Sequence, residues 1–317
     1  MHLLSENLPF STGKLCFCQY NKLKFVTVKK RVIVCGATGK VGGSVIERLL
    51  SEKAFRVVAL TRSSGSAAAE KLRLGGAEIV EADLADLESL LRAFRDVHAV
   101  FAVTQPWDSQ TGRYNVAKEI IQAKNILWAC RETGISHLIY TSFLNSGQRQ
   151  TGVSFVDSKI RIEELIMAFK VSYTILRCGP FMDNLQISTE RGRIAGKYGN
   201  ETPVPYTALS DIGRLADVVL HQPASYKNTI LNLFNSPVSG RQLALAATEL
   251  TGKKFIYIAE SAVVQYFRYP ETLKLRLYFN RNKVSFNRTV NLCPTEVSGK
   301  RFVLKSFGAF LSELPPE

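Results

Sequence analysis

From residue 31 onward, the sequence alternates short runs of apolar, largely β-branched residues with longer stretches in which apolar residues recur every three or four positions. Short apolar runs predict buried strands, and the longer spacing predicts amphipathic helices. We therefore expect six strands, at residues 31–35, 55–61, 77–82, 98–104, 136–142 and 172–178. Helices are expected between them, from the glycines after the first strand to about residue 50 and at residues 66–74, 86–94, 113–134 and 157–170.

The alternation of strands and helices also predicts how the strands are arranged. A helix between two strands is too long for a hairpin, so consecutive strands must run parallel through right-handed crossovers, with helices on both faces of the sheet. Two βαβαβ halves of this kind form a doubly wound parallel Rossmann sheet, in the α/β class. We assign this core, which we expect to bind NADP(H), to residues 30–178.

The pattern loosens after residue 179 but does not lose its α/β character. A strand near 229–234 is expected to return to the main sheet, and residues 239–252 and 253–259 predict a helix followed by a strand. We assign residues 179–317 to a smaller C-terminal α/β lobe that contacts a substrate or a partner.

Charge sets the N-terminal segment apart from the rest. The chain has a net charge of +14, and its first 31 residues hold six Lys or Arg and one acidic residue. We favour an unstructured extension over residues 1–29, and an organelle-targeting segment within residues 1–30 is the alternative. No apolar run is long enough to span a bilayer, so we expect no membrane contact and a cytoplasmic protein, with the nucleus as a second location.

Basic and aromatic residues mix in "LKLRLYFNRNKVSFNR", residues 273–288. A half-buried element with a solvated face is the favoured interpretation. The acidic surface of a partner protein is a second, and nucleic acid is the least favoured because no nucleic-acid-binding motif accompanies the segment. Cysteines and histidines are scattered without ligand spacing, so we expect no metal site.

The stretch "VCGATGKVGGS", residues 34–44, is the strongest local signal. Gly36, Gly39 and Gly42 follow a predicted strand and open a predicted helix. Glycines at this spacing allow a tight turn, close approach of the backbone to a pyrophosphate, and close packing of the helix on the strand. The N-terminus of the helix would then present free N–H groups to the phosphates. A βα turn without a ligand is the alternative.

The end of the second strand decides between the two nicotinamide dinucleotides. NAD-binding proteins place an acid there for the ribose hydroxyls, whereas this chain has Arg62, followed by Ser63 and Ser64. An arginine suits a 2′-phosphate, and Lys40 could add charge to it, so we expect NADP(H) to be preferred over NAD(H). After the third strand, Asp83 is placed to meet the adenine edge and could equally cap the next helix, and the two roles are compatible.

Several motifs together resemble the NmrA-like family, an atypical branch of the short-chain dehydrogenase/reductase superfamily. The resemblance covers about residues 30–265 and is strongest in the first half. The motifs that carry it are "GATGKVG", "TRS", "ADLAD", "VFAVTQPW", "HLIYTS", "FVDSK", "LRCGPFMDNL" and "LSDIGRLADVVL". The family has a Rossmann fold with a smaller C-terminal lobe. Its members include NAD(P)-binding redox-sensing regulators that contact partner proteins, and related branches include quinone and phenylpropanoid reductases.

The resemblance implies a set of cofactor-binding residues. The pyrophosphate would be held by the glycine loop, which comprises Gly36, Ala37, Thr38, Gly39, Lys40 and Val41, with Gly42 following. The 2′-phosphate would be held by Arg62, Ser63 and Ser64, continuing to Ser66, and the adenine by Asp83 and Leu84. The ribose would be approached by Thr104 and Gln105, continuing to Pro106, the nicotinamide ribose by Lys159, and the nicotinamide by Phe181, Met182, Asp183 and Asn184.

The catalytic residues of the superfamily are only partly present. Typical short-chain dehydrogenases use a serine, a tyrosine and a lysine four residues after the tyrosine, and the lysine lowers the pKa of the tyrosine. "FVDSK" supplies Lys159, and Ser142 has the spacing of the serine, but Phe155 stands where the tyrosine belongs. The phenyl ring of Phe155 cannot donate a proton. Lys159 and Ser142 are therefore the remaining catalytic candidates.

Two functions follow from the missing tyrosine. The leading interpretation is an NADP(H)-binding redox sensor or regulator with little or no turnover that acts through a partner protein. The alternative is an NADPH-dependent reductase of a quinone, enone or other small aromatic substrate. General acid catalysis contributes about 10²- to 10⁴-fold to a reaction rate. Reduction of a quinone depends less on this contribution than reduction of a simple ketone.

Overall fold

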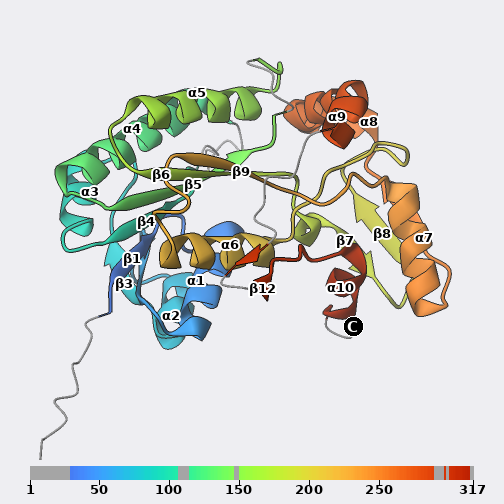
Figure 1. Ribbon diagram of the computed structural model, residues 1–317. Coiled ribbons are helices and arrows are strands. Elements are labelled where there is room, and N and C mark those ends of the chain that lie inside the picture. The colour runs from blue at the N-terminus through green and yellow to red at the C-terminus, as the bar shows by residue number, and fades with distance from the viewer. Residues whose placement is uncertain (1–28, 106–113, 146–149, 289–295, 298–299, 315–317) are drawn as a thin grey trace, which may run out of the picture.

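The computed structural model describes residues 29–105, 114–145, 150–288, 296–297 and 300–314. A seven-stranded, wholly parallel sheet forms the centre of the molecule (Figure 1), in the order β3-β2-β1-β4-β5-β6-β9. Its strands are β1 (Arg31–Val34), β2 (Arg56–Thr61), β3 (Glu78–Glu81), β4 (Ala99–Ala102), β5 (His137–Phe143), β6 (Tyr173–Cys178) and β9 (Thr229–Leu233). The order reverses between β1 and β4, which is the switch point of a doubly wound Rossmann sheet.

Helices cover both faces of this sheet (Figure 1). Helices α3, α4 and α5 lie on one face, and α1, α2 and α6 lie on the other. Their bounds are α1 (Lys40–Glu52), α2 (Ala67–Leu74), α3 (Leu87–Ala93), α4 (Val116–Glu132), α5 (Ser154–Ala168) and α6 (Leu209–His221). The expected helix over 157–170 thus begins three residues earlier, so that Phe155 and Lys159 lie on the same helix.

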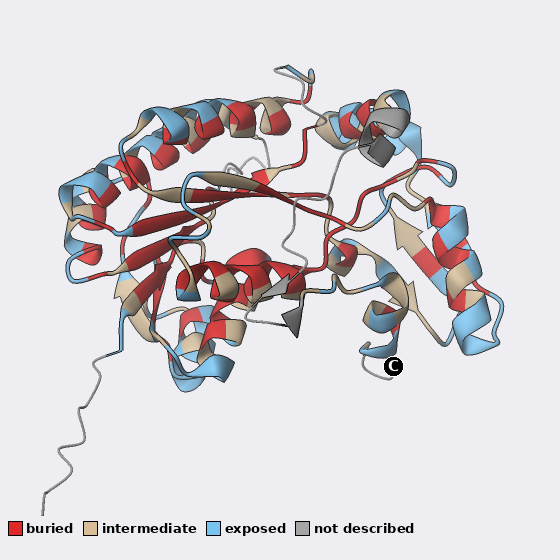
Figure 2. Ribbon diagram, in the orientation of Figure 1, coloured by how far each residue is buried: buried red, intermediate tan, exposed pale blue. Residues whose placement is uncertain are grey.

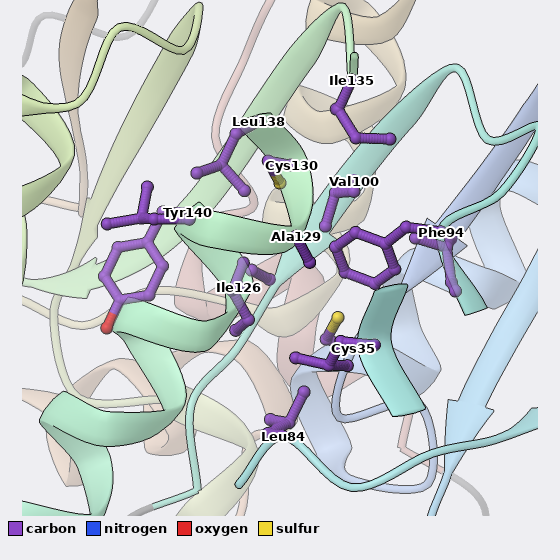
Figure 3. Packing of buried hydrophobic residues seen from close by; sticks show 14 of the residues in the cluster. Cys35, Leu84, Phe94, Val100, Ile126, Ala129, Cys130, Ile135, Leu138 and Tyr140 are labelled. Atoms are coloured by element: carbon purple, nitrogen blue, oxygen red, sulfur yellow. The ribbon is translucent and has the colours of Figure 1, made fainter. Parts of the chain in front are cut away.

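The two faces of the sheet carry separate apolar cores. Figure 2 shows the central strands of the main sheet largely buried, its edge strand β3 only partly buried, and the helices buried on their inner sides. Figure 3 shows the core under α4, where Ile126, Ala129 and Cys130 lie near Leu138 of β5. Tyr140 packs its ring into the same core, while its hydroxyl points away from the labelled side chains. Cys35 and Cys178 are buried, one in each of the two cores.

The second part of the chain contributes both to the main sheet and to a smaller lobe. After β6 come the short helix η1 (Met182–Asn184) and strands β7 (Gln186–Ser188) and β8 (Arg193–Gly196). These three elements were not predicted from the sequence. The chain then passes through α6 to β9, which pairs parallel to β6. Strand β10 (Ile256–Ala259) pairs with β8, so the lobe has its own sheet, in the order β10-β8-β7.

Helices complete the lobe (Figure 1). They are α7 (Gly240–Thr251), α8 (Ala262–Arg268), α9 (Pro270–Arg288) and α10 (Phe307–Ser312); the two short strands β11 (Glu296–Val297) and β12 (Lys300–Arg301) pair with each other. Leu275, Tyr278 and Phe279 of α9 are buried, as expected of a half-buried element in the basic segment. Among the helices of the described residues, none combines the length and apolar character needed to cross a bilayer.

Candidate functional site

A cleft of about 770 Å³ lies where the sheet meets the lobe. It extends from the ends of β2 and β3, past the glycine loop, to α9 of the lobe. Most of the cofactor residues implied by the sequence line it. These are Gly36, Thr38, Gly39, Lys40, Val41, Gly42, Arg62, Asp83, Leu84, Thr104, Gln105, Lys159, Phe181 and Asn184, together with Ser142. Ligands of doubly wound sheets bind at this carboxyl edge of the strands.

The glycine loop forms a tight turn against the first turn of α1. Gly36 has φ +71°, a conformation that other residues rarely adopt. A Cβ atom on Gly42 would lie 2.3 Å from the carbonyl oxygen of Gly36, so no side chain fits there. Gly39 caps α1 without a side-chain hydrogen bond, and the first turn of the helix holds no acidic residue. The loop therefore leaves backbone N–H groups and a positive helix end for an anion such as a pyrophosphate.

Lys40 points to the opposite end of the cleft from the one we expected. Its ammonium donates to Asn184 Oδ1 at 2.8 Å and to the Asp183 carbonyl at 3.4 Å. The expectation that Lys40 adds charge beside Arg62 is not met by this arrangement, because the nearest anchor of the side chain is η1. Lys40 instead ties the glycine loop to residues 183–184.

The turn after β2 carries the residues expected at a 2′-phosphate. Arg62 is exposed, and among the described residues its side chain has no hydrogen-bond or ion-pair partner. Ser66 caps α2 by accepting a hydrogen bond from the Ala69 backbone. Ser64 donates both its backbone N–H (2.8 Å) and its hydroxyl (2.5 Å) to one carboxylate oxygen of Glu81, the last residue of β3. An acid therefore lies beside the expected phosphate position.

The role of Asp83 as a helix cap is wrong, although Asp83 does line the cleft. Asp86 caps α3, accepting from the Glu88 backbone. Asp83 Oδ1 instead accepts from the Ala85 backbone at 2.9 Å, which closes the turn before the helix. Of Asp83 and Asp86, the N-cap is Asp86, because it directly precedes Leu87, the first residue of the helix.

Lys159 lies at the floor of the cleft in a closed network. Its ammonium lies 2.9 Å from Glu119 Oε1 and donates to Thr104 Oγ1 at 2.8 Å and to Tyr140 Oη at 3.0 Å. An ammonium has three protons, and these three partners take all of them. The carbonyl of Thr141 lies further away, at 3.5 Å.

Glu119, on α4, is the buried counterion of this lysine. Its side chain has no exposed surface. Besides the ammonium of Lys159, it accepts hydrogen bonds from Thr104 (2.7 Å), Ser158 (2.5 Å) and Tyr114. All the lone-pair positions of the carboxylate are thus used, which is what a buried charge requires to remain ionised.

Glu119 and Lys159 each stabilise the charged form of the other. Burial opposes ionisation of Glu119, but Lys159 and the donated hydrogen bonds outweigh it and lower the pKa of Glu119. Burial likewise opposes the ammonium of Lys159, but Glu119 and Tyr140 raise its pKa above the ordinary value. Burial chiefly raises the pKa of Tyr140 and of Tyr114. The site therefore holds a fixed ammonium, a fixed carboxylate and two neutral phenols near neutral pH.

Ser142 makes a hydrogen bond that does not involve Lys159. Its hydroxyl donates at 2.5 Å to Glu163 of α5. Arg177 of β6 holds the same carboxylate, with Nε at 3.0 Å and Nη2 at 2.5 Å. The proton of Ser142 is thus directed at the buried carboxylate of an ion pair, although the residue lines the cleft.

Aromatic side chains form the wall of the cleft beyond Lys159. Phe155 packs edge-on against Phe143, with ring centroids 5.4 Å apart, and lies 6.0 Å from the ring of Tyr114. Further along, the lining comes from the lobe and is also largely apolar: Leu185, Tyr198, Tyr206 and Leu275. This end of the cleft can accept a flat, apolar molecule.

Several of the expected cofactor residues do not line the cleft. Ala37 and Met182 are buried, and Asp183 accepts from the backbone of Leu209 at the start of α6. Ser63, Ser64 and Ser66 lie between β2 and α2 and are absent from the residues that line the cleft. Pro106 lies outside the described residues. Within the described part of the chain, no group of His, Cys, Asp and Glu side chains could hold a metal ion.

Sequence reasoning missed Glu119, Tyr140 and Tyr114. A signal for Glu119 was present, because it lies four residues before Ala123 and therefore on the apolar stripe of its helix. A carboxylate at such a position is buried and must have partners. Tyr114 and Tyr140 carried no comparable signal, since only the fold brings the end of β5 and the approach to α4 beside α5.

The fold, the glycine loop and the cleft at the switch point define a dinucleotide-binding type of Rossmann protein. The model of the NmrA-like family matches residues 28–296, and the chain belongs to this family. An NmrA-like family domain-containing oxidoreductase of Aspergillus campestris is 29% identical over 260 residues, which cover 74% of this chain and 76% of that protein. Quinone oxidoreductase 2 of Escherichia coli is 26% identical over 71% of this chain and 76% of its own length.

Solved structures have the same fold. The triphenylmethane reductase of Citrobacter sp., complexed with NADP(H), aligns with a TM-score of 0.69 and 22% identity, over 89% of this chain and 99% of that chain. NmrA, a negative transcriptional regulator, in complex with NADP, aligns with a TM-score of 0.64 and 19% identity, over 80% of this chain and 83% of that chain. Named oxidoreductases and a named regulator thus share this fold.

Proposed function

We propose that this protein is an NADPH-dependent reductase of small quinoid or other flat aromatic acceptors. The observation that carries the proposal is the extension of the cleft beyond Lys159, where Phe143, Phe155, Leu185, Tyr198, Tyr206 and Leu275 surround further space. A protein that only senses the dinucleotide has no need of this apolar extension. The named oxidoreductases among the relatives support the same class of reaction.

The cofactor assignment rests on the two ends of the cleft. The glycine loop and the N-terminus of α1 suit the pyrophosphate, as the exclusion of a Cβ at Gly42 indicates. Arg62 would hold the 2′-phosphate, with Asp83 and Leu84 near the adenine. When bound, the reduced dinucleotide supplies a hydride. In this proposal Lys159, Asn184 and Phe181 line the half of the cleft that receives the nicotinamide.

The closed network around Lys159 supports an acceptor that needs no proton from the protein. Lys159 is held charged by Glu119, so it provides a fixed positive field and is a poor acid. Phe155 has no proton to give, and the proton of Ser142 goes to Glu163. A quinone that takes up a hydride becomes a hydroquinone anion, which the field of Lys159 stabilises and which then takes its proton from water.

The test is NADPH oxidation measured against a panel of quinones and a panel of simple ketones. We expect quinone turnover and, for ketones, rates lower by about 10²- to 10⁴-fold. Leu275→Trp, which fills the far end of the cleft, should raise the KM for the quinone without changing the affinity for NADPH. Leu277→Trp on the exposed side of the same helix is the matched control. Ketone turnover equal to quinone turnover would overturn the proposal.

A dinucleotide-sensing regulator is the second candidate function. The observation in its favour is that all three protons of Lys159 are already used within the protein. Such a protein would bind NADP(H) without oxidising it and would respond through a protein partner, in the cytoplasm or nucleus. Tight NADPH binding with no turnover across the quinone panel would favour this function over the reductase.

A further inference from the structure

The turn after β2 contains an acid that the cofactor assignment does not use. Glu81 is the last residue of β3 and lies opposite Thr61 in the register of β2 and β3. Its carboxylate is exposed and accepts two hydrogen bonds from Ser64, from the backbone N–H at 2.8 Å and from the hydroxyl at 2.5 Å. Arg62, one residue after Thr61, has no partner of its own among the described residues.

The position of this carboxylate matters because a phosphate uses the same donors. A serine hydroxyl and an adjacent backbone N–H, beside an arginine, form a typical anion site. Here the anion in contact with the two donors is a side chain of the protein itself. A 2′-phosphate approaching Arg62 would either displace Glu81 from Ser64 or bind near a like charge, and both reduce its affinity.

We propose that Glu81 is a specificity-determining residue that competes with the 2′-phosphate of NADP(H) for Ser64 and so limits the preference for NADP(H) over NAD(H). This inference rests on the dinucleotide site proposed above. NAD(H) carries a hydroxyl in place of the phosphate and does not compete with the carboxylate. Arg62 and Glu81 then act in opposite directions on the same selectivity.

The geometry distinguishes Glu81 from its acidic neighbours. Asp83 is occupied by the turn before α3, through the Ala85 backbone. Glu78, three residues earlier on β3, pairs with Arg31 and Arg56 at the other end of the strand. Hydrogen bonds from the Ser64 side chain and backbone lower the pKa of Glu81, so its charge is present throughout the neutral range.

The experiment compares the dissociation constants of NADP(H) and NAD(H) for the full chain and for Glu81→Gln. The variant should bind NADP(H) about three- to tenfold more tightly, the size expected for an exposed charge near a dianion, with NAD(H) changed less than twofold. Glu249→Gln removes the same charge from an exposed site in the lobe and should change neither. Adenosine 2′,5′-bisphosphate, used as a probe without nicotinamide, should show the same gain as NADP(H).

A second variant tests whether Ser64 mediates the effect. Ser64→Ala leaves one of the two donors, so adding Glu81→Gln to it should give a smaller gain than in the full chain. Equal gains in both backgrounds, or equal changes for NADP(H) and NAD(H), would overturn the role of Glu81 and leave the reductase proposal intact. Failure of the unmodified chain to bind either dinucleotide would overturn both.

Discussion

Glu119 and Lys159 form a buried ion pair, with 2.9 Å between the carboxylate oxygen Oε1 and the ammonium nitrogen. The pair joins α4 to α5 below the cleft, and Thr104, Tyr140, Ser158 and Tyr114 complete its hydrogen bonds. Lys159 is thereby held as a charged ammonium whose three protons are all directed at partners within the protein. The reactivity proposed for the cleft depends on this relationship.

The first prediction concerns the stability that the pair contributes. Glu119→Gln leaves the ammonium of Lys159 buried without a counterion, which should lower the free energy of unfolding by about 3 kcal/mol. Removing both charges, in Glu119→Gln with Lys159→Met, should cost less than the single change. Urea denaturation measures both values. An effect of Glu119→Gln below about 0.5 kcal/mol would show that the pair is not formed.

The second prediction concerns the missing tyrosine. Phe155→Tyr places a phenol one helical turn before Lys159, as in typical short-chain dehydrogenases. We expect a gain in ketone reduction of less than about tenfold, because Glu119 neutralises the charge that would otherwise lower the pKa of that phenol. The gain should be larger in the Glu119→Gln background. Steady-state kcat/KM with a simple ketone tests this, and a 10³-fold gain from Phe155→Tyr alone would contradict it.

The third prediction concerns Arg62. Arg62→Asp should weaken NADP(H) binding by at least about tenfold, because it replaces an attraction for the 2′-phosphate with a repulsion, and should leave NAD(H) nearly unchanged. Titration with both dinucleotides measures the two constants. Arg161→Asp, an equal change of charge at an exposed position of α5, is the control. Equal losses for both dinucleotides would exclude a role in binding the phosphate.

The fourth prediction concerns Ser142. Because its hydroxyl donates to Glu163 beside Arg177, Ser142→Ala should lower the free energy of unfolding by about 1 kcal/mol. The turnover number with a quinone should change less than threefold. Denaturation and kinetics are measured on the same variant. A loss of turnover above tenfold, with unfolding unchanged, would instead make the serine catalytic, as its spacing in the sequence indicates.

The fifth prediction concerns the pH dependence of stability. Burial, followed by the charges of His98 and Lys227, lowers the pKa of His137 to about 4. The folded protein therefore binds fewer protons at this residue than the unfolded chain between about pH 6.5 and 4. Stability is full above this window and falls by up to about 3 kcal/mol as the pH drops through it.

Denaturation at pH 7 and pH 4 tests this last prediction. His137 contacts Ser172 and Thr174, both within 3.0 Å. His137→Gln should flatten the difference between the two pH values. His98→Gln, at a less buried position, should leave most of it. An unchanged pH dependence in His137→Gln would show that other groups are responsible.

Local patterns in the sequence predicted the main sheet and its ligand edge well. The six strands from 31–35 to 172–178 were predicted because buried parallel strands are continuous apolar runs. The turn after the first strand was predicted from the spacing of Gly36, Gly39 and Gly42. The strands β7 and β8 were not predicted, since strands of three and four residues carry little pattern. The helix α6 was also not predicted, although its buried residues recur at helical spacing. The start of α5 was missed because Val153, its cap, has no capping side chain.

The chemistry of the cleft was less predictable than its location. Lys159 and Ser142 were identified by spacing along the chain, but their partners lie 40 and 21 residues away, at Glu119 and Glu163. A side chain's hydrogen bonds depend on which elements meet in space, which periodicity does not encode. Lys40 and Glu81 are further examples, because their contacts with Asn184 and Ser64 cross between separate elements.

The return of β9 to the main sheet has a consequence for dividing the chain. Because Thr229–Leu233 pair with Thr174–Cys178 of β6, the residues between Cys178 and Thr229 are an excursion from the sheet and not a separate tail. A fragment ending at Cys178 would expose β6, a largely buried strand, as an open sheet edge with which other chains could pair. Biochemical dissection of this protein should therefore keep both halves on one polypeptide, or supply β9 as a second chain.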